Sequence, residues 1–176
     1  MEAALRVIVP NIIGDLSFQV YPYHCKHDLL DKLPARLRGY AAWLPPDWRI
    51  MVIVDRDNDS CKQLKQQLET AAYNAGLKTR AQGDGPRIDV VNRLAIEELE
   101  AWFLGDWDAV QAAYPGVSGN IPYKQAYRDP DAIAGGTWEA LERTLRRAGY
   151  FRTGLRKVEA ARAIAQHMEP KRNRSR

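Results

Sequence analysis

The chain has 176 residues, of which 45% are hydrophobic and 27% are charged, and its formal net charge is +4. These values are typical of one ordinary globular domain and exclude a disordered or fibrous protein. No stretch approaches the roughly 20 apolar residues of a membrane span, and the first residues lack the pattern of a signal peptide. We therefore expect a cytoplasmic protein without a membrane partner, whose mild positive charge allows binding to nucleic acid without requiring it.

The first third of the chain predicts a helix, a strand and a second helix. Apolar residues recur with helical spacing through residues 2–9, and Gly14 follows as a stop signal. Residues 17–21 alternate between apolar and polar side chains, which predicts a strand near the edge of a sheet. An apolar stripe then runs from residue 28 to residue 40. Pro34 interrupts it and predicts either a kink or a new helix start.

Residues 49–55 are the clearest strand in the sequence. Five consecutive apolar residues, most of them β-branched, run directly into Asp55 and Asp57. An apolar run without alternation predicts a buried parallel strand that is covered on both faces, so we expect it at the centre of the sheet. In such sheets ligands bind at the carboxyl ends of the strands. Two carboxylates at that end, pointing the same way if the chain stays extended, favour a hard cation such as Mg²⁺ or Mn²⁺.

A structural alternative exists for the same carboxylates. Asp57, Asn58 and Asp59 would also suit a polar turn that caps the next helix, which is predicted from Cys61 to Ala75. This alternative needs no metal. It leaves Asp55 unexplained, because Asp59 or Ser60 can cap the helix without it.

A second acidic group follows the next predicted strand, at residues 87–94. The sequence then predicts a helix over residues 95–104, which begins with Glu97, Glu98 and Glu100. Glu97 and Glu100 are three residues apart and would share one helical face, whereas Glu98 would point elsewhere. Carboxylates are also common at helix starts for electrostatic reasons alone. Both explanations of Glu97 and Glu100 stay open on the sequence.

The order of helices and strands predicts an α/β fold, with a three-layer parallel sheet flanked by helices and a helical C-terminal extension. Residues 114–136 contain three prolines and four glycines and predict a long loop, and helices are expected at 137–148 and 155–168. The predicted organisation is an α/β core over 1–113, a loop and helical extension of the same domain over 114–168, and a basic tail over 169–176. The composition of the tail is typical of a solvated, disordered end.

The strand with Asp-x-Asp at residues 50–57, the helix containing Cys61 and the segment Ala95–Asp106 together resemble a Toprim-related bacterial family catalogued as domain of unknown function 4276. The similarity covers nearly the whole chain. Toprim domains bind divalent metal through an Asp-x-Asp and a separate glutamate. The resemblance therefore implies catalytic roles for Asp55, Asp57, Glu97 and Glu100, with Mg²⁺ or Mn²⁺ held by Asp55, Asp57 and Glu100.

The same resemblance implies a function. Toprim domains occur in topoisomerases, primases and nucleases, so the expected activity is metal-dependent cleavage or transfer at phosphodiester bonds, with DNA favoured over RNA. The habits of Toprim nucleases further imply an ATPase partner protein and a role in defence against foreign DNA. A non-catalytic interaction subunit of the same fold is the alternative from another class.

One part of the Toprim pattern is absent from this sequence. Toprim domains usually open with a strand that ends in a catalytic glutamate, whereas Met1–Leu5 already belong to the predicted first helix. We therefore expect the first strand to be missing and the chain alone to have weak nuclease activity or none. The sheet would then keep an open edge that a second copy of the chain could cover, which would produce a homodimer.

Overall fold

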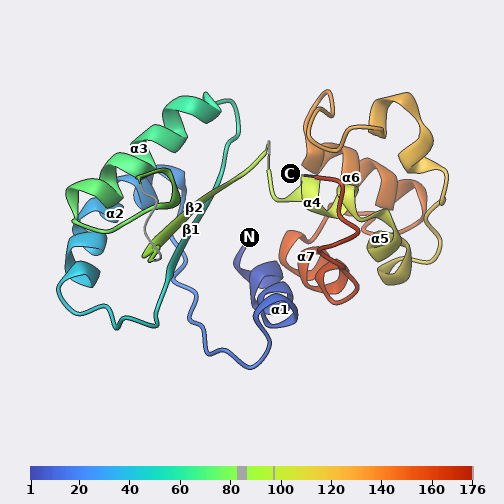
Figure 1. Ribbon diagram of the computed structural model, residues 1–176. Helices are drawn as coiled ribbons and strands as arrows, with labels where there is room; N and C mark the ends of the chain where they lie inside the picture. Colours follow the sequence, from blue (N-terminus) through green and yellow to red (C-terminus); the bar gives the residue numbers. More distant parts are fainter. Residues whose placement is uncertain (83–86, 97, 176) are drawn as a thin grey trace. The chain divides into compact units, whose positions relative to one another are not determined.

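The structure is a computed structural model that describes residues 1–82, 87–96 and 98–175. The chain forms two compact units, each with its own hydrophobic core. One, here called the sheet unit, comprises Tyr23–Ala95. The other, the helical unit, combines Met1–Pro22 with Ile96–Arg176. Figure 1 shows the elements of both units.

The sheet unit contains two helices, two strands and a short 3₁₀ turn: α2 (Lys26–Ala41), β1 (Ile50–Asp55), α3 (Cys61–Asn74), Arg80–Gln82 and β2 (Val90–Ala95). The strands are parallel, in a register that runs from the pair Ile50 and Val90 to the pair Asp55 and Ala95. Both helices lie on one face of this sheet (Figure 1), where Val52, Val54 and Val90 pack against helical leucines. The predicted parallel α/β character is therefore confirmed.

The expected position of β1 within the sheet is wrong. Among the described residues, β1 pairs with β2 alone, whereas β2 also forms an isolated parallel bridge through Thr79. Val52 and Val54 are buried, but Met51 on the opposite face is 61% exposed. An apolar run predicts a strand correctly, but it does not specify how many neighbours or how many covered faces that strand has.

The strand expected at residues 17–21 is also absent from the structure. Residues 16–23 have no strand or helix, and Leu16 and Tyr21 are 70% and 52% exposed. Alternation of apolar and polar residues is a weak signal, because a strand also needs a neighbour that accepts its backbone hydrogen bonds. Within the described residues the sheet has two strands, so the finer expectation of three layers is not confirmed.

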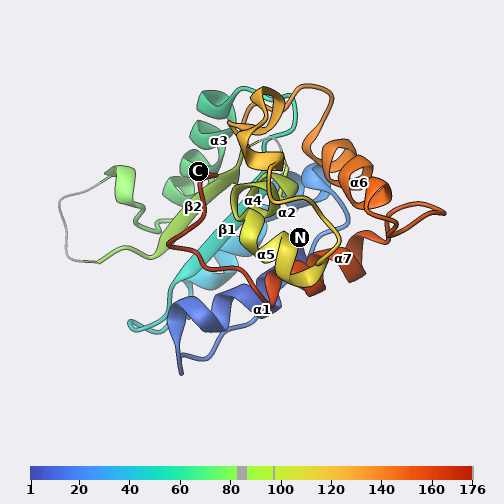
Figure 2. The ribbon, with the colours of Figure 1, turned by 90° about the vertical axis from the view of Figure 1, so that its right-hand side faces the viewer.

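In its described residues the helical unit has five helices, with 3₁₀ turns at Ile121–Tyr123 and Gln125–Tyr127: α1 (Glu2–Ile13), α4 (Glu100–Gly105), α5 (Trp107–Ala113), α6 (Thr137–Arg147) and α7 (Lys157–Ala165). Helix α1 packs along α7, and α4 packs against α6 (Figure 2). Phe103, Leu141 and Ile164 are almost completely buried in the core between the helices. Periodicity predicted α1, α6 and α7 correctly, and Gly14 ends α1 with φ 63°.

Helix α4 begins later than its sequence pattern predicts. Ala95 is the last residue of β2, where it pairs with Asp55, and the helix starts at Glu100. Pairing with β1 therefore places Ala95 in a strand, although alanine also favours helices. Tertiary contacts often override such a local preference.

The basic C-terminal segment is ordered through residue 175, in contrast to the expected solvated tail. Its anchor is Asp106, whose side chain is completely buried and which lies just after α4. The Asp106 carboxylate accepts hydrogen bonds from Arg172 Nε at 2.7 Å, Arg172 Nη2 at 3.1 Å and the Glu169 amide at 2.7 Å. It also caps α5 by accepting from the Ala109 amide. One buried charge thus holds the segment and begins a helix.

Residues beyond Arg172 continue this contact along α4. Asn173 Nδ2 donates to the Trp102 carbonyl at 2.8 Å, and the Arg174 amide donates to the Gly105 carbonyl at 3.2 Å. A side chain at Gly105 would overlap Asn173 and Ser175, so glycine permits the close approach of the two backbones. The segment is therefore part of the packed helical unit.

Candidate functional site at the carboxyl end of β1

Asp55 lies where the sequence predicts it, at the carboxyl end of a parallel strand. It is the last residue of β1 and is half-buried. The next residue continues the contact with the neighbouring strand, because the Arg56 amide donates to the Ala95 carbonyl at 2.9 Å. The carboxyl end of both strands therefore presents Asp55 beside Ala95.

The chain turns immediately after Asp55. Asp57 has φ 50°, in the left-handed region that aspartate adopts more readily than most residues, and the Asp59 amide donates to the Arg56 carbonyl at 3.1 Å. Ser60 then caps α3 by accepting from the Gln63 amide at 3.4 Å. The polar turn proposed as the structural alternative is thus present, with Ser60 as its cap. The assumption of an extended chain from Asp55 to Asp57 is wrong.

Lys26 completes this site from the first turn of α2. Its ammonium donates to Asp57 Oδ2 at 2.6 Å and to the Arg56 carbonyl at 3.1 Å, and it lies 2.7 Å from Asp59 Oδ2. The Lys26 side chain is only 15% exposed. Burial acts to lower the pKa of Lys26, but the hydrogen bonds to Asp57 and Asp59 outweigh it and raise the pKa. The same contact lowers the pKa of Asp59.

The donor atoms of this site suit a hard cation, but their number is small. Mg²⁺ prefers carboxylate oxygens and commonly uses one or two carboxylates together with water or phosphate oxygens. Over residues 1–82, 87–96 and 98–175, no group of three His, Cys, Asp or Glu side chains is placed to hold a metal ion. A metal bound by Oδ2 of Asp57 would compete with the Lys26 ammonium for that atom. The site therefore fits a metal that also binds its substrate better than a permanent structural ion.

Glu98 and Glu100 of the second acidic group lie in the helical unit, but their carboxylates have different contacts. Glu97 lies outside the described residues. Glu98 Oε2 accepts from Thr137 Oγ1 at 3.0 Å and from the Trp138 amide at 3.3 Å, so it caps the start of α6. Because α4 begins at Glu100, the expected helical face shared by Glu97 and Glu100 is not formed by α4.

Glu100 is half-buried at the first residue of α4. Burial raises the pKa of its carboxyl, and the nearby Glu98 carboxylate adds to this effect, while Lys157 opposes it. Asp55 and Asp57 thus occur together in the sheet unit, and Glu98 and Glu100 occur together in the helical unit.

The raised pKa of Glu100 predicts a pH-dependent gain in stability when its charge is removed. The folded state binds the Glu100 proton more tightly than the unfolded chain does, so the wild type loses stability as pH rises from the unfolded pKa, about 4.3, through the folded pKa. Glu100→Gln should therefore raise the free energy of unfolding at pH 7, and the gain should vanish below about pH 4. Urea titrations at both pH values test this, with exposed Glu169→Gln as the control. An equal change at both pH values would contradict the assignment.

Sequence reasoning missed Lys26 because nothing in its local pattern marks it. It lies 31 residues before Asp57, and only the packing of α2 beside the end of β1 brings the two side chains together. A single lysine at a predicted helix start has no spacing relationship to a later acidic turn. Asp59 was considered only as a cap and proves to be the second carboxylate bound by Lys26.

The fold and the site define an α/β protein with a small parallel sheet and an acidic turn at its carboxyl edge. The family model described as Domain of unknown function (DUF4276) matches residues 1–176, and the chain belongs to this family. No curated protein and no solved structure matches the chain. None of the helices in the described ranges has the length and apolar character needed to cross a membrane.

Proposed function

We propose that the chain is a Mg²⁺- or Mn²⁺-dependent, Toprim-like phosphoryl-transfer domain that acts on the phosphodiester bonds of nucleic acid. The observation that supports this most is the position of Asp55 and Asp57 at the carboxyl end of β1, the edge where parallel sheets bind ligands. The left-handed backbone of Asp57 is a second support, since residues in sparsely populated conformations cluster at functional sites.

In this proposal Asp55 and Asp57 hold the cation, which neutralises phosphoryl charge and activates water. Lys26 has a role that the sequence did not predict. It offsets one of the two negative charges of Asp57 and Asp59 when no metal is bound, and its ammonium becomes available to a substrate phosphate when metal takes its place. A further ligand from Glu97 or Glu100 stays a prediction from the sequence.

A non-catalytic interaction subunit is the second candidate. It is favoured by one specific observation, that Asp57 and Asp59 already share a buried cationic partner and so need no metal for stability. In this candidate the acidic turn serves only to join β1 to α3. The ATPase partner, the defence role and dimerisation at the sheet edge are compatible with either candidate.

Metal titration separates the two candidates. Asp55→Asn with Asp57→Asn should weaken Mn²⁺ binding by more than the roughly tenfold loss typical of removing an outer-shell partner, because direct ligands are lost. Lys26→Met should strengthen Mn²⁺ binding, because the ion no longer displaces an ammonium. Calorimetry measures both effects, and exposed Asp47→Asn is the matched control.

Activity is tested with the same proteins on supercoiled plasmid in Mg²⁺ and in Mn²⁺, with the ATPase partner added if one is found. The proposal predicts that cleavage depends on Asp55 and Asp57 and not on Asp47. If the wild type and the double variant bind Mn²⁺ equally and neither cleaves DNA, the interaction subunit becomes the better account.

A further inference from the structure

The positive charge of the protein is concentrated in one segment of the helical unit. Residues 142–162 contain six arginines and one lysine, but only two carboxylates, so their net charge of +5 exceeds the +4 of the whole chain. All seven cations are exposed. By contrast, Arg172 of the C-terminal segment is already engaged by Asp106. The described part of α6, α7 and the loop between them therefore carries a dense group of exposed cations.

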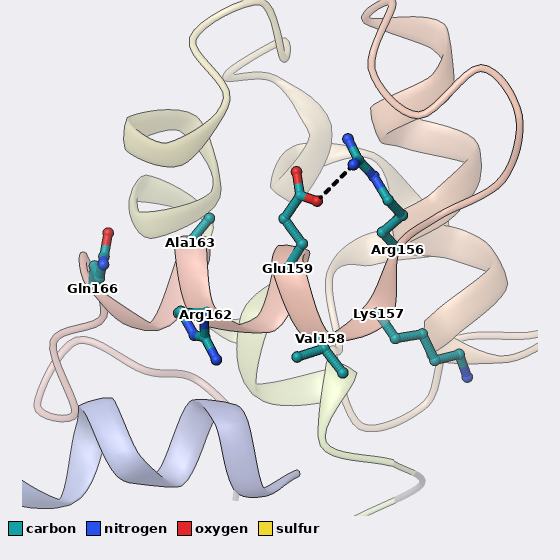
Figure 3. A pocket seen from close by; sticks show the side chains of 7 residues that line it. All are labelled: Arg156, Lys157, Val158, Glu159, Arg162, Ala163 and Gln166. Carbon is teal, nitrogen blue, oxygen red and sulfur yellow. Dashed lines mark ion pairs between the residues drawn. The ribbon is translucent and has the colours of Figure 1, made fainter.

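Three of these cations line a groove of about 660 Å³ along α7, formed by Arg156, Lys157, Val158, Glu159, Arg162, Ala163 and Gln166. Figure 3 shows Arg156 and Glu159 directed to one side of α7, where they approach each other, and Lys157, Val158 and Arg162 directed to the other side. Glu159 is the groove's one carboxylate and lies 3.1 Å from Arg156 Nη1. The lining therefore stays positive overall and suits an anionic ligand.

Aromatic rings hold two of the groove cations in place. Lys157 Nζ lies 3.9 Å from the centroid of the Trp138 ring, and the Arg156 guanidinium lies 5.6 Å from that of Phe151. Such contacts reduce the side-chain freedom that a ligand would otherwise have to restrict on binding. The first turn of α7 adds amide donors, because no side chain caps it and Arg156 stands at its N-cap. The groove thus combines pre-positioned cations with backbone donors.

We propose that the α7 groove binds the phosphate backbone of nucleic acid. Arginine predominates in residues 142–162, and its planar guanidinium matches phosphate geometry. From Lys157 to Arg162 the helix rises roughly 8 Å, or about two steps of one nucleic-acid strand at about 3.4 Å each. A membrane surface fits less well, because Val158 is the groove's single exposed apolar side chain of any size. This site does not depend on the metal chemistry proposed at β1.

The test is fluorescence anisotropy with a labelled 20-base-pair DNA duplex in EDTA, between 50 and 200 mM salt. Each phosphate contact contributes about 0.9 to the slope of log affinity against log salt concentration. The triple variant Arg156→Gln, Lys157→Gln, Arg162→Gln should therefore lower the slope by about 2.7 and bind about tenfold or more weakly at 50 mM salt. The matched control Lys62→Gln, Lys124→Gln, Lys171→Gln removes three exposed charges elsewhere and should bind like the wild type.

Circular dichroism verifies that the variants fold. If the triple variant does not, Arg162→Gln alone should lower the slope by about 0.9. The proposal is overturned if the groove variants bind as the wild type does, if the control weakens equally, or if polyglutamate or phosphatidylserine vesicles bind the wild type as tightly as DNA. Because EDTA removes the metal, this assay measures binding at the groove alone, and the plasmid assay in Mg²⁺ or Mn²⁺ tests the proposed enzyme separately, so failure of one proposal is distinguishable from failure of the other.

Discussion

Asp106→Ala is expected to lower the free energy of unfolding by about 3–5 kcal/mol. The substitution removes a helix cap and three further hydrogen bonds to Arg172 and the Glu169 amide, all made by a completely buried carboxylate. Loss of the cap alone costs about 1 kcal/mol. Water partly screens the ion pair between Arg172 and Asp106, because the Arg172 side chain is 44% exposed. The rest of the expected loss therefore comes mainly from the hydrogen bonds to the buried Asp106 carboxylate. Urea unfolding measures the change.

Asp108→Ala is the matched control for this effect. Asp108 also approaches Arg172, at 3.6 Å, but it is 69% exposed and should contribute less than about 1 kcal/mol. Trypsin provides a local readout, because Asp106→Ala should expose Lys171 and Arg172 to cleavage while the wild type protects them. Equal stability losses in the two variants, or unchanged tryptic cleavage, would show that Asp106 does not anchor the C-terminal segment.

Leu68→Ala should destabilise the sheet unit by about 2–5 kcal/mol. Leu68 is completely buried on α3 and belongs to the cluster that includes Leu37 of α2 and Val52 of β1. In a two-stranded sheet covered by helices on one face, the leucines supply most of the apolar contact that holds strands and helices together. The cavity left by alanine therefore adds to the lost transfer free energy.

Leu16→Ala makes the same chemical change at a site that is 70% exposed, and it should alter stability by less than about 0.5 kcal/mol. Comparing the urea midpoints of Leu68→Ala and Leu16→Ala separates the effect of burial from the effect of replacing leucine by alanine. A loss at Leu16 as large as that at Leu68 would indicate that residues 16–23 pack in solution, in the manner that their alternating pattern first suggested.

Much of the candidate site could be predicted because its signal is local. The apolar run before Asp55 specifies both a strand and the direction in which it ends, so the position of Asp55 at the carboxyl end of a parallel strand follows from about nine residues. The geometry beyond Asp55 could not be predicted in the same way. Aspartate is compatible with extended and left-handed backbone alike, and the turn at Asp57 is stabilised by Lys26 from a distant helix.

The roles of Glu98 and Glu100 could not be predicted from the sequence either. Acidic residues near a helix start were consistent with either a metal site or simple capping, and the sequence could not separate the two. In the structure Glu98 caps α6, a helix that begins 39 residues later, while Glu100 is half-buried beside it with a raised pKa. The environment of a carboxylate depends on what packs over it, and that is a tertiary property.

The sequence by itself determined the elements whose causes are contained within them: β1 from its apolar run, α1, α6 and α7 from their periodicity, and the end of α1 from Gly14. Tertiary structure decided the absence of a strand at residues 17–21, the pairing of Ala95 with β1 and the docking of residues 169–175 on Asp106. The physical reason is common to all three. A backbone or charged group takes its position according to the partner that satisfies its hydrogen bonds. That partner lies 40 residues away in the ladder and 63 to 71 residues away in the docked segment.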